Sequence, residues 1–308
     1  IVEAEGIYVG YKYYETRYFD SVMNPSFHAD SGAGATQSDS WNYDNEVVYS
    51  FGHTLSYLDY TQELKSVNVD KNTDGDITAV IAVTNKSNQD GRFLAQLYVQ
   101  QPYTAYDMEN GVEKSAVMFL NSAKVNVAAG ATEEVTITVP AKYLASYDYR
   151  NAKTYILDEG DYYFTAAAGA HEAVNNFLAA QGKTTADGMD AQATGGTVVW
   201  SDNTSLDTTT FAIAHDTEIT NVADDADLNY WTGEDTVVYL SRQDWEGTYP
   251  INYNTDVEIN ISDSPKAEEW IAALRGQQYT IQTDNPATEG GDKGVRLNST
   301  YVQEEQLS

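Results

Sequence analysis

Apolar and polar residues alternate along several short stretches of this chain, and the alternation predicts β-strands. Residues 135–139 place an apolar side chain at every second position, and residues 93–99 show a similar spacing, as expected of half-buried strands. Residues 77–83 and 161–167 are further β-like runs, and Asp-Gly, Asn-Gly and Glu-Gly pairs lie between the runs. Short strands separated by turns predict an antiparallel β-sandwich over about residues 45–170.

The segments on either side of the predicted sandwich have a different character. Residues 1–20 are dense in tyrosine, which favours strand or turn, and residues 21–44 are small and polar, which favours a loop. Residues 171–180 have an apolar helical face, and Ser264-Pro265 begins a second short helix that Gly276 ends. Further strand-like runs occur at residues 198–200, 211–213 and 237–240. We expect a polar tail over residues 277–308.

Charge and cysteine content exclude several classes of protein. The 308 residues include 47 acidic and 17 basic side chains, a surplus of 30 negative charges, and no cysteine. A nucleic-acid binder needs a basic face, and disulfides or thiolate metal sites need cysteine, so these classes are excluded. No run of about 18 apolar residues predicts a membrane span, and no signal peptide is expected in the chain. A secreted, cell-surface or cytoplasmic bacterial location stays open.

One acidic stretch resembles a calcium-binding loop. Its candidate oxygen ligands are Asp70, Asn72, Asp74 and Asp76. Gly75 stands where such a loop turns sharply, but the position of the expected bidentate glutamate is occupied by Ile81. The favoured interpretation is a hairpin turn that needs no metal. We therefore expect no cofactor, with calcium as the alternative.

A second group combines aromatic rings with carboxylates between residues 224 and 249. The candidate substrate-binding residues are Trp231, Asp244, Trp245 and Tyr249. Aromatic faces beside carboxylates can hold sugars, but the same residues are common in packing and at interfaces, and both interpretations stay open. Asp244 follows a strand-like run, the position from which a barrel presents a carboxylate nucleophile, yet no succession of barrel units is present, so a structural role is favoured.

Three stretches resemble glycoside hydrolase family 3, the β-glucosidase family. Residues 5–14 (EGIYVGYKYY) resemble the segment that leaves that family's α/β sandwich domain. Residues 48–57 (VYSFGHTLSY) are similar to the motif that opens its fibronectin type III-like domain, although Ser50 replaces a proline and His53-Thr54 replaces an aromatic-glycine pair. Residues 83–99 resemble a strand pair of the same domain. Residues 220–229 and 239–250 look like the connector of members with a permuted domain order.

The resemblance implies a division of the chain and a role for it. It implies an exit segment and loop at 1–44, a fibronectin type III-like sandwich at 45–170, and a helix, linker and connector at 171–308. The family's enzymes are retaining β-glycosidases whose two catalytic carboxylates lie in a barrel and an α/β sandwich domain, so the resemblance assigns no catalytic residue to this chain. The implied partners are those two domains and, through them, a β-glycoside substrate.

Two functions follow as hypotheses. The first is a non-catalytic scaffold of a family 3 glycosidase, which positions the catalytic domains; enzyme activity is then expected of the parent and not established for this chain. The second is a stand-alone carbohydrate-binding or adhesive β-sandwich, for which Trp231, Trp245 and Tyr249 would supply the rings. Saturable heat on titration with β-glucan would favour the second.

Overall fold

The computed structural model describes residues 5–53, 55–191, 193, 196–212, 220–221, 224–233, 237–248, 265–269 and 271–272. The chain divides into two compact units, each described by itself below. The first comprises Ile1–Val222 and Tyr239–Ile251, and the second Ala223–Val238 and Asn252–Ser308.

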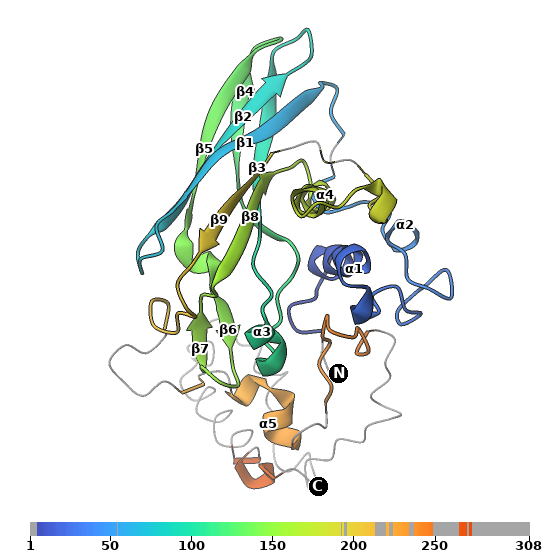
Figure 1. Ribbon diagram of the computed structural model, residues 1–308, viewed down its shortest axis with the longest axis vertical. Helices are drawn as coiled ribbons and strands as arrows, with labels where there is room; N and C mark the ends of the chain where they lie inside the picture. The colour runs from blue at the N-terminus through green and yellow to red at the C-terminus, as the bar shows by residue number, and fades with distance from the viewer. Residues whose placement is uncertain are drawn as a thin grey trace, which may run out of the picture. The chain divides into compact units, whose positions relative to one another are not determined.

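The first unit is built on two antiparallel sheets that face one another (Figure 1). One sheet has the strand order β1-β2-β5, with β1 at Tyr60–Val69, β2 at Asp76–Asn85 and β5 at Thr132–Pro140. The other has the order β4-β3-β8-β9, with β4 at Met118–Val127, β3 at Gly91–Gln100, β8 at Gly160–Ala166 and β9 at Thr197–Asp202. A small hairpin pairs β6 (Ser146–Asp148) with β7 (Thr154–Ile156). The predicted mainly β, antiparallel fold is confirmed.

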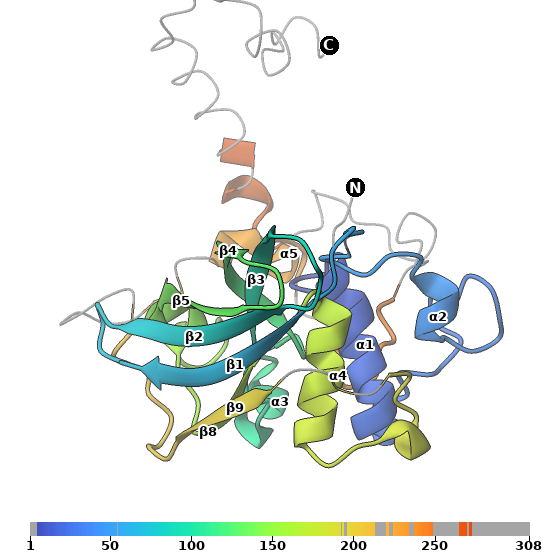
Figure 2. The ribbon, with the colours of Figure 1, turned by 90° about the horizontal axis from the view of Figure 1, so that it is seen from above.

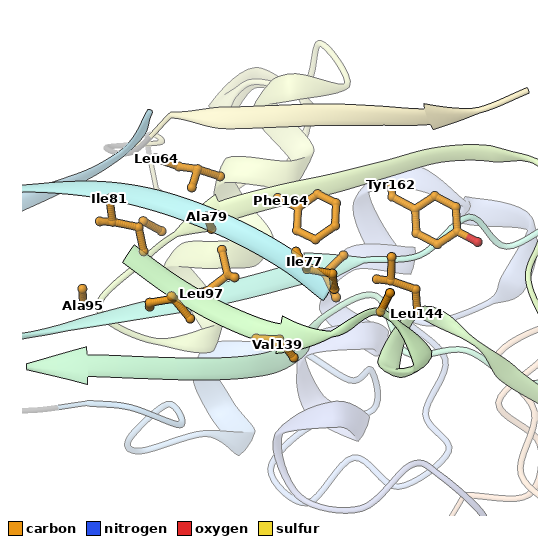
Figure 3. Packing of buried hydrophobic residues seen from close by; sticks show 14 of the residues in the cluster. Leu64, Ile77, Ala79, Ile81, Ala95, Leu97, Val139, Leu144, Tyr162 and Phe164 are labelled. Carbon is orange, nitrogen blue, oxygen red and sulfur yellow. The ribbon is translucent and has the colours of Figure 1, made fainter. Parts of the chain in front are cut away.

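Alternation of side chains explains how the two sheets form one core. In β2, Ile77, Ala79, Ile81 and Val83 are fully buried, while the residues between them are partly exposed. Figure 3 shows Ile77 and Ile81 of β2 packed in one cluster with Leu97 of β3 and Phe164 of β8. Burying one face of each sheet in this way supplies the main favourable free energy of folding.

Short helices accompany the sandwich. In the first unit they are α1 (Tyr11–Met23), η1 (Pro25–Phe27), α2 (Tyr43–Glu46), α3 (Ala105–Asn110), η2 (Ala141–Leu144), α4 (Ala170–Ala180) and η3 (Thr185–Asp187). Helices α1 and α4 lie side by side next to the sandwich (Figure 2). Helix α4 confirms the predicted helix, because Ala173, Val174, Phe177 and Leu178 are all buried.

Two sequence expectations are wrong. The tyrosine-rich segment expected as strand or turn contains the 13-residue helix α1. The run Val237–Leu240, expected as a strand, has no regular structure. Helix α1 forms because one of its faces is covered by α4 and by residues 113–119, so tertiary burial outweighs the β-propensity of tyrosine. Ile213 and Trp270, each part of a predicted element, lie outside the described residues.

The second unit is described over two short stretches. It contains η4 (Asp224–Ala226) and α5 (Leu228–Thr232), and residues 267–269 and 271–272 are helical. Asp227 begins α5 by accepting a hydrogen bond from the Asn229 backbone N–H. The Asn229 side chain exchanges two hydrogen bonds with the Val237 backbone, at 2.7 and 2.8 Å.

The sandwich core gives a direct stability prediction. Phe164 of β8 is fully buried, so Phe164→Ala should lower the free energy of unfolding by about 3–5 kcal/mol. Val199 of β9 is 45% exposed, so Val199→Ala serves as the matched control and should change it by less than ~1 kcal/mol. Urea unfolding followed by circular dichroism would measure both. Equal effects would contradict the assignment of Phe164 to the core.

Candidate functional site: a buried clamp

An ion pair in the first unit joins two segments that are far apart in the sequence. Arg242 donates from Nε to Asp20 Oδ2 at 3.0 Å, and its Nη2 donates to Asp20 Oδ1. A further bond runs from Arg242 Nη1 to the carbonyl of Lys114 at 2.8 Å. Both charged side chains are almost completely buried. Burial alone would lower the pKa of Arg242, but the charge and hydrogen bonds of Asp20 outweigh it and raise that pKa. We call Asp20, Arg242 and Glu113 the clamp.

Glu113 joins the N-terminal segment to residues 241–242 at a second point. Its Oε2 accepts a hydrogen bond from the Tyr8 hydroxyl at 2.5 Å, and its Oε1 accepts one from Ser241 Oγ at 2.6 Å. The backbone N–H of Arg242 also donates to Glu113 Oε2 at 3.2 Å. One carboxylate from the sandwich side therefore holds the N-terminal segment and the segment 239–248 together.

Trp245 fills the space beside the clamp. Its side chain is fully buried, with its ring centroid 5.3 Å from that of Tyr8 and 5.7 Å from that of Tyr13. Its backbone is left-handed, with φ at +59°, a strained conformation for a bulky residue that the surrounding packing must enforce. Gly247 follows, where a Cβ would lie 3.0 Å from the Leu240 Cα, so the chain turns back closely on itself.

Arg17 of α1 organises the loop after the helix. Its guanidinium donates to the carbonyls of Ala29 at 2.7 Å, Ala33 at 2.6 Å and Ser31 at 3.1 Å. It also lies over the ring of Trp41, 4.9 Å from the centroid. A single buried cation thus holds three backbone carbonyls of a loop rich in small residues, which explains why that loop is ordered against α1.

A second polar cluster joins α1 to α4. His171 of α4 contacts Glu15 of α1 through Nδ1 at 2.8 Å and Asp190 through Nε2 at 2.5 Å. Its ring stacks on Tyr43 with centroids 4.0 Å apart. Burial would lower the pKa of His171, but the hydrogen bonds to Asp190 and Glu15 prevail and raise it to about 9. His171 is therefore protonated at neutral pH and bridges two carboxylates.

Two of the candidate sugar-binding residues, Asp244 and Trp245, are described in the first unit, where they differ in exposure. Trp245 is buried against tyrosines, so its ring does not face solvent. The neighbouring Asp244 is exposed and accepts a hydrogen bond from the Glu246 backbone N–H at 3.0 Å. Trp231 lies half-buried in α5 of the second unit, and Tyr249 lies outside the described residues. A substrate-binding role for these residues stays a prediction.

The candidate calcium loop is a tight hairpin between β1 and β2. The Asp70 carboxylate accepts hydrogen bonds from the backbone N–H and the side-chain amide of Asn72, at 3.2 and 2.6 Å. The Asp70 N–H donates to the carbonyl of Asp76 at 3.0 Å, and a Cβ at Gly75 would lie 2.0 Å from the Asp70 carbonyl oxygen. Ile81 is fully buried in β2. Asp74 lies in this turn, and Asp76 is the first residue of β2. Among the described residues, no group of three or more His, Asp or Glu side chains is arranged to hold a metal ion; calcium binding here stays a prediction.

The ionisable groups of the clamp are engaged in ion pairs and hydrogen bonds with other groups of the protein, an arrangement that suits a structural role more than a catalytic one. Arg242 and Asp20 neutralise one another, and Glu113 accepts three hydrogen bonds. Lys114 next to the clamp is likewise buried between Asp107, at 2.8 Å, and Asp158. Over the described part of the chain, no helix is both long and apolar enough to cross a membrane.

The profile of the fibronectin type III-like domain family matches residues 94–170. This chain contains a fibronectin type III-like domain. The match covers most of β3 and all of β4, β5 and β8, which supply three strands of one sheet and one of the other, and it includes the β6-β7 hairpin. The matched residues 94–170 support the resemblance to family 3 β-glucosidases, and the bounds 45–170 stay a prediction.

Curated relatives of the chain are β-glucosidases. A "Probable beta-glucosidase I" of Emericella nidulans is 28% identical over 168 residues, covering 53% of this chain and 16% of the relative. A "Beta-glucosidase" of Rhizobium radiobacter is 27% identical over 168 residues, covering 54% and 16%. The chain thus spans about one sixth of the length of these relatives. Because fungal and bacterial proteins are both among them, they do not favour the bacterial origin that we expected.

Solved structures of β-glucosidases also align with the region. One from Paenibacillus barengoltzii has 24% identity and a TM-score of 0.40, covering 55% of this chain and 16% of its own. A GH3 β-glucosidase from Bifidobacterium adolescentis has 24% identity and a TM-score of 0.36, covering 53% and 19%.

The pH dependence of stability should report the His171 bridge. Because the folded-state pKa of about 9 exceeds the usual 6.5, the bridge contributes fully below about pH 6.5 and is lost as pH rises to about 9. The stability difference between the wild type and His171→Phe should therefore shrink by about 3 kcal/mol across that interval. Denaturant unfolding at several pH values would measure it. A difference that does not change with pH would rule out the charged bridge.

The hairpin geometry predicts indifference to calcium. The Asp70 carboxylate is already engaged by Asn72, so the melting temperature should be the same in excess EDTA and in excess Ca²⁺. Calorimetry under both conditions would measure this, with Asp74→Asn as the comparison variant. A rise in melting temperature with Ca²⁺ that Asp74→Asn abolishes would instead establish the calcium site.

Proposed function

We propose that this chain is the non-catalytic scaffold portion of a family 3 glycoside hydrolase that hydrolyses β-glycosides. In this role the chain positions the parent's barrel and α/β sandwich domains and carries none of the catalytic carboxylates. The fibronectin type III-like domain and the β-glucosidase relatives, each about six times longer than the matched region, support the proposal.

The observation that carries the proposal is an exposed apolar surface on two segments beside the sandwich. Val48 is 84% exposed and Leu55 is 94% exposed, and Tyr49 and Val9 are also largely exposed. We call residues 7–9 and 48–57 the docking segments. Several large apolar side chains left exposed within a short segment are typical of surfaces that another domain covers.

The docking segments also lack carboxylates and the side chains of lysine and arginine. Residues 7–9 and 47–57 contain no Asp, Glu, Lys or Arg, with His53 as their one imidazole, although 47 of the 308 residues are acidic. An uncharged window in so acidic a chain lets another domain approach without desolvating carboxylates, which is costly. Charge and hydrophobicity therefore support docking at the same place.

The clamp makes such docking mechanically useful. Tyr8 belongs to a docking segment and is tied by Glu113 to residues 241–242, which Arg242 in turn ties to α1. A domain that packs on the docking segments would thus be attached to a rigid body. In a retaining glycosidase the two carboxylates must lie about 5–5.5 Å apart, and a displacement of about 1 Å can cost 10²-fold in rate. Rigidity between domains is therefore what a scaffold must supply.

The rival hypothesis of a stand-alone carbohydrate-binding module has less support. It relied on the rings of Trp231, Trp245 and Tyr249, and the ring of Trp245 is enclosed by Tyr8 and Tyr13. Trp231 is half-buried in α5 and Tyr249 lies outside the described residues, so neither adds an observation in favour of this hypothesis.

The proposal predicts different effects in the isolated chain and in the parent enzyme. The pair of changes Val48→Ser and Leu55→Ser should alter the stability of the 308-residue chain by less than ~0.5 kcal/mol, because both side chains are exposed there. In the parent, where the docking segments would be covered, the same pair should cost about 2 kcal/mol or more and lower kcat. Calorimetry and hydrolysis of an aryl β-glucoside would measure these effects.

A matched control and a contradicting outcome are available. Val199 is exposed on β9, away from the docking segments, so Val199→Ser should change neither protein. If the paired variant left the parent's stability and kinetics unchanged, docking through these segments would be refuted.

A further inference from the structure

A buried lysine in the first unit lies between two carboxylates that do not belong to the clamp. Lys114 Nζ is 2.8 Å from Asp107 Oδ2 and also contacts Asp158 Oδ2. None of the three side chains is more than 3% exposed. Two carboxylates around one ammonium leave a net negative charge, and burying an uncompensated charge is costly. An ion pair alone therefore leaves the second carboxylate unexplained.

The fold holds the lysine amine and the Asp158 carboxyl in contact. Lys114 lies between α3 and β4, and Asp158 lies between β7 and β8, 44 positions further along the chain. The ammonium also donates to the carbonyl of Pro102 at 3.2 Å. Two reacting groups held together in this way can behave as if at an effective concentration of about 10⁵–10⁸ M. The geometry thus favours a reaction between the two side chains.

Burial brings the two groups toward their reactive forms. It raises the pKa of Asp158, against the lowering effect of the Lys114 charge, and so favours the neutral carboxyl. Transfer of one proton from Nζ to Asp158 Oδ2 gives an uncharged amine and an uncharged carboxylic acid. The uncharged amine is the nucleophilic form of a lysine, and the acid is the form that can lose its hydroxyl as water.

We propose that Lys114 and Asp158 condense to an amide bond between Nζ and Cγ. After the first proton transfer, Nζ attacks Cγ, the N–C bond forms, and a second proton of Nζ passes to Asp107. Asp107 returns that proton to the hydroxyl on Cγ, the C–O bond breaks and one water leaves. Ammonium plus carboxylate therefore become amide plus water, Asp107 ends unchanged, and no oxidant or other reactant is needed.

Asp107 is placed to carry this proton. Its Oδ2, the atom nearest to Nζ, is fixed by a hydrogen bond from the Thr104 backbone N–H at 2.7 Å. Its Oδ1 is buried and has no hydrogen-bond partner within the described part of the chain. A buried polar atom without a partner needs an explanation. A carboxyl that takes up and releases a proton during the reaction supplies one, whereas a merely structural ion pair does not.

The bond would give this chain a covalent cross-link that cysteine cannot supply, since the sequence contains none. It closes a loop that contains β4, β5 and the β6-β7 hairpin. Strand β4 is at the edge of its sheet, and the bond ties the segment that leads into it to the segment that leads into β8. Cross-links stabilise a fold mainly by restricting the unfolded chain.

The test measures the intact mass of the purified 308-residue chain by mass spectrometry under denaturing conditions. The wild type should be about 18 Da lighter than its sequence requires, the mass of one water. Proteolytic digestion should yield one branched peptide that joins the segments of Lys114 and Asp158, and trypsin should not cleave after Lys114. Lys114→Arg keeps the positive charge but lacks the primary amine, so this variant should have its full mass.

Asp107→Asn tests the proton carrier. It leaves Lys114 and Asp158 in place, so the bond should still be possible but should form about 100-fold or more slowly. Cell-free synthesis with the mass recorded over time would measure this rate. An unchanged rate in Asp107→Asn would overturn the role of Asp107.

The matched control is Lys71→Arg. Lys71 contacts Asp202 at 2.8 Å, but its side chain is 35% exposed, so the pair should not condense and the variant should keep the wild-type mass deficit. A wild type of full mass, or a loss of water that persists in Lys114→Arg, would overturn the proposal. These measurements need no partner domain, so they succeed or fail independently of the scaffold function.

Discussion

The buried pairing of Arg242 with Asp20 is the interaction on which the arrangement of the first unit depends. Removing one partner from such a pair costs about 3–5 kcal/mol, because a buried charge is left alone. The segment 239–248 therefore cannot leave its place without leaving Asp20 unpaired on α1. Trp245 and Glu113 complete the same attachment by packing and by hydrogen bonds. Helix α1, the sandwich and this segment consequently behave as one body.

Much of the sandwich could be predicted from the sequence, because its signal is local. The strands β2, β3, β5 and β8 each place apolar residues at alternate positions. Such a pattern predicts a strand from neighbouring residues alone, because it needs only one face of the strand to be buried. Helix α1 was mispredicted because its tyrosines favour strands when taken alone. Its period was nevertheless visible: Tyr11, Tyr18 and Val22 recur at helical spacing and pack in one cluster. Residues of β9 were recognised as strand-like, but their pairing with β8 could not be inferred from that run.

The clamp could not be predicted in the same way, because its members are distant in the sequence. Asp20 and Arg242 are 222 positions apart, and each taken alone is one charged residue among many. Trp245 shows that a local motif can also be ambiguous. An Asp-Trp pair among aromatic residues and carboxylates suits a sugar site as well as a packed interior, and only the fold places the tryptophan against Tyr8 and Tyr13. The family resemblance located the motif segments but not the contacts that fix them.

The charge distribution connects the interior to the docking segments. The described interior buries the cations Arg17, Lys114 and Arg242, and Lys114 and Arg242 are paired there with buried carboxylates. Repulsion among surface carboxylates is screened by salt over about 10 Å at 0.1 M, whereas the buried pairs are screened much less. A surface of this kind offers a second domain few places to pack without bringing carboxylates out of water. Residues 47–57, which contain no Asp, Glu, Lys or Arg, are the place that we propose, so the same acidic surplus that excludes nucleic acid also favours where another domain would attach.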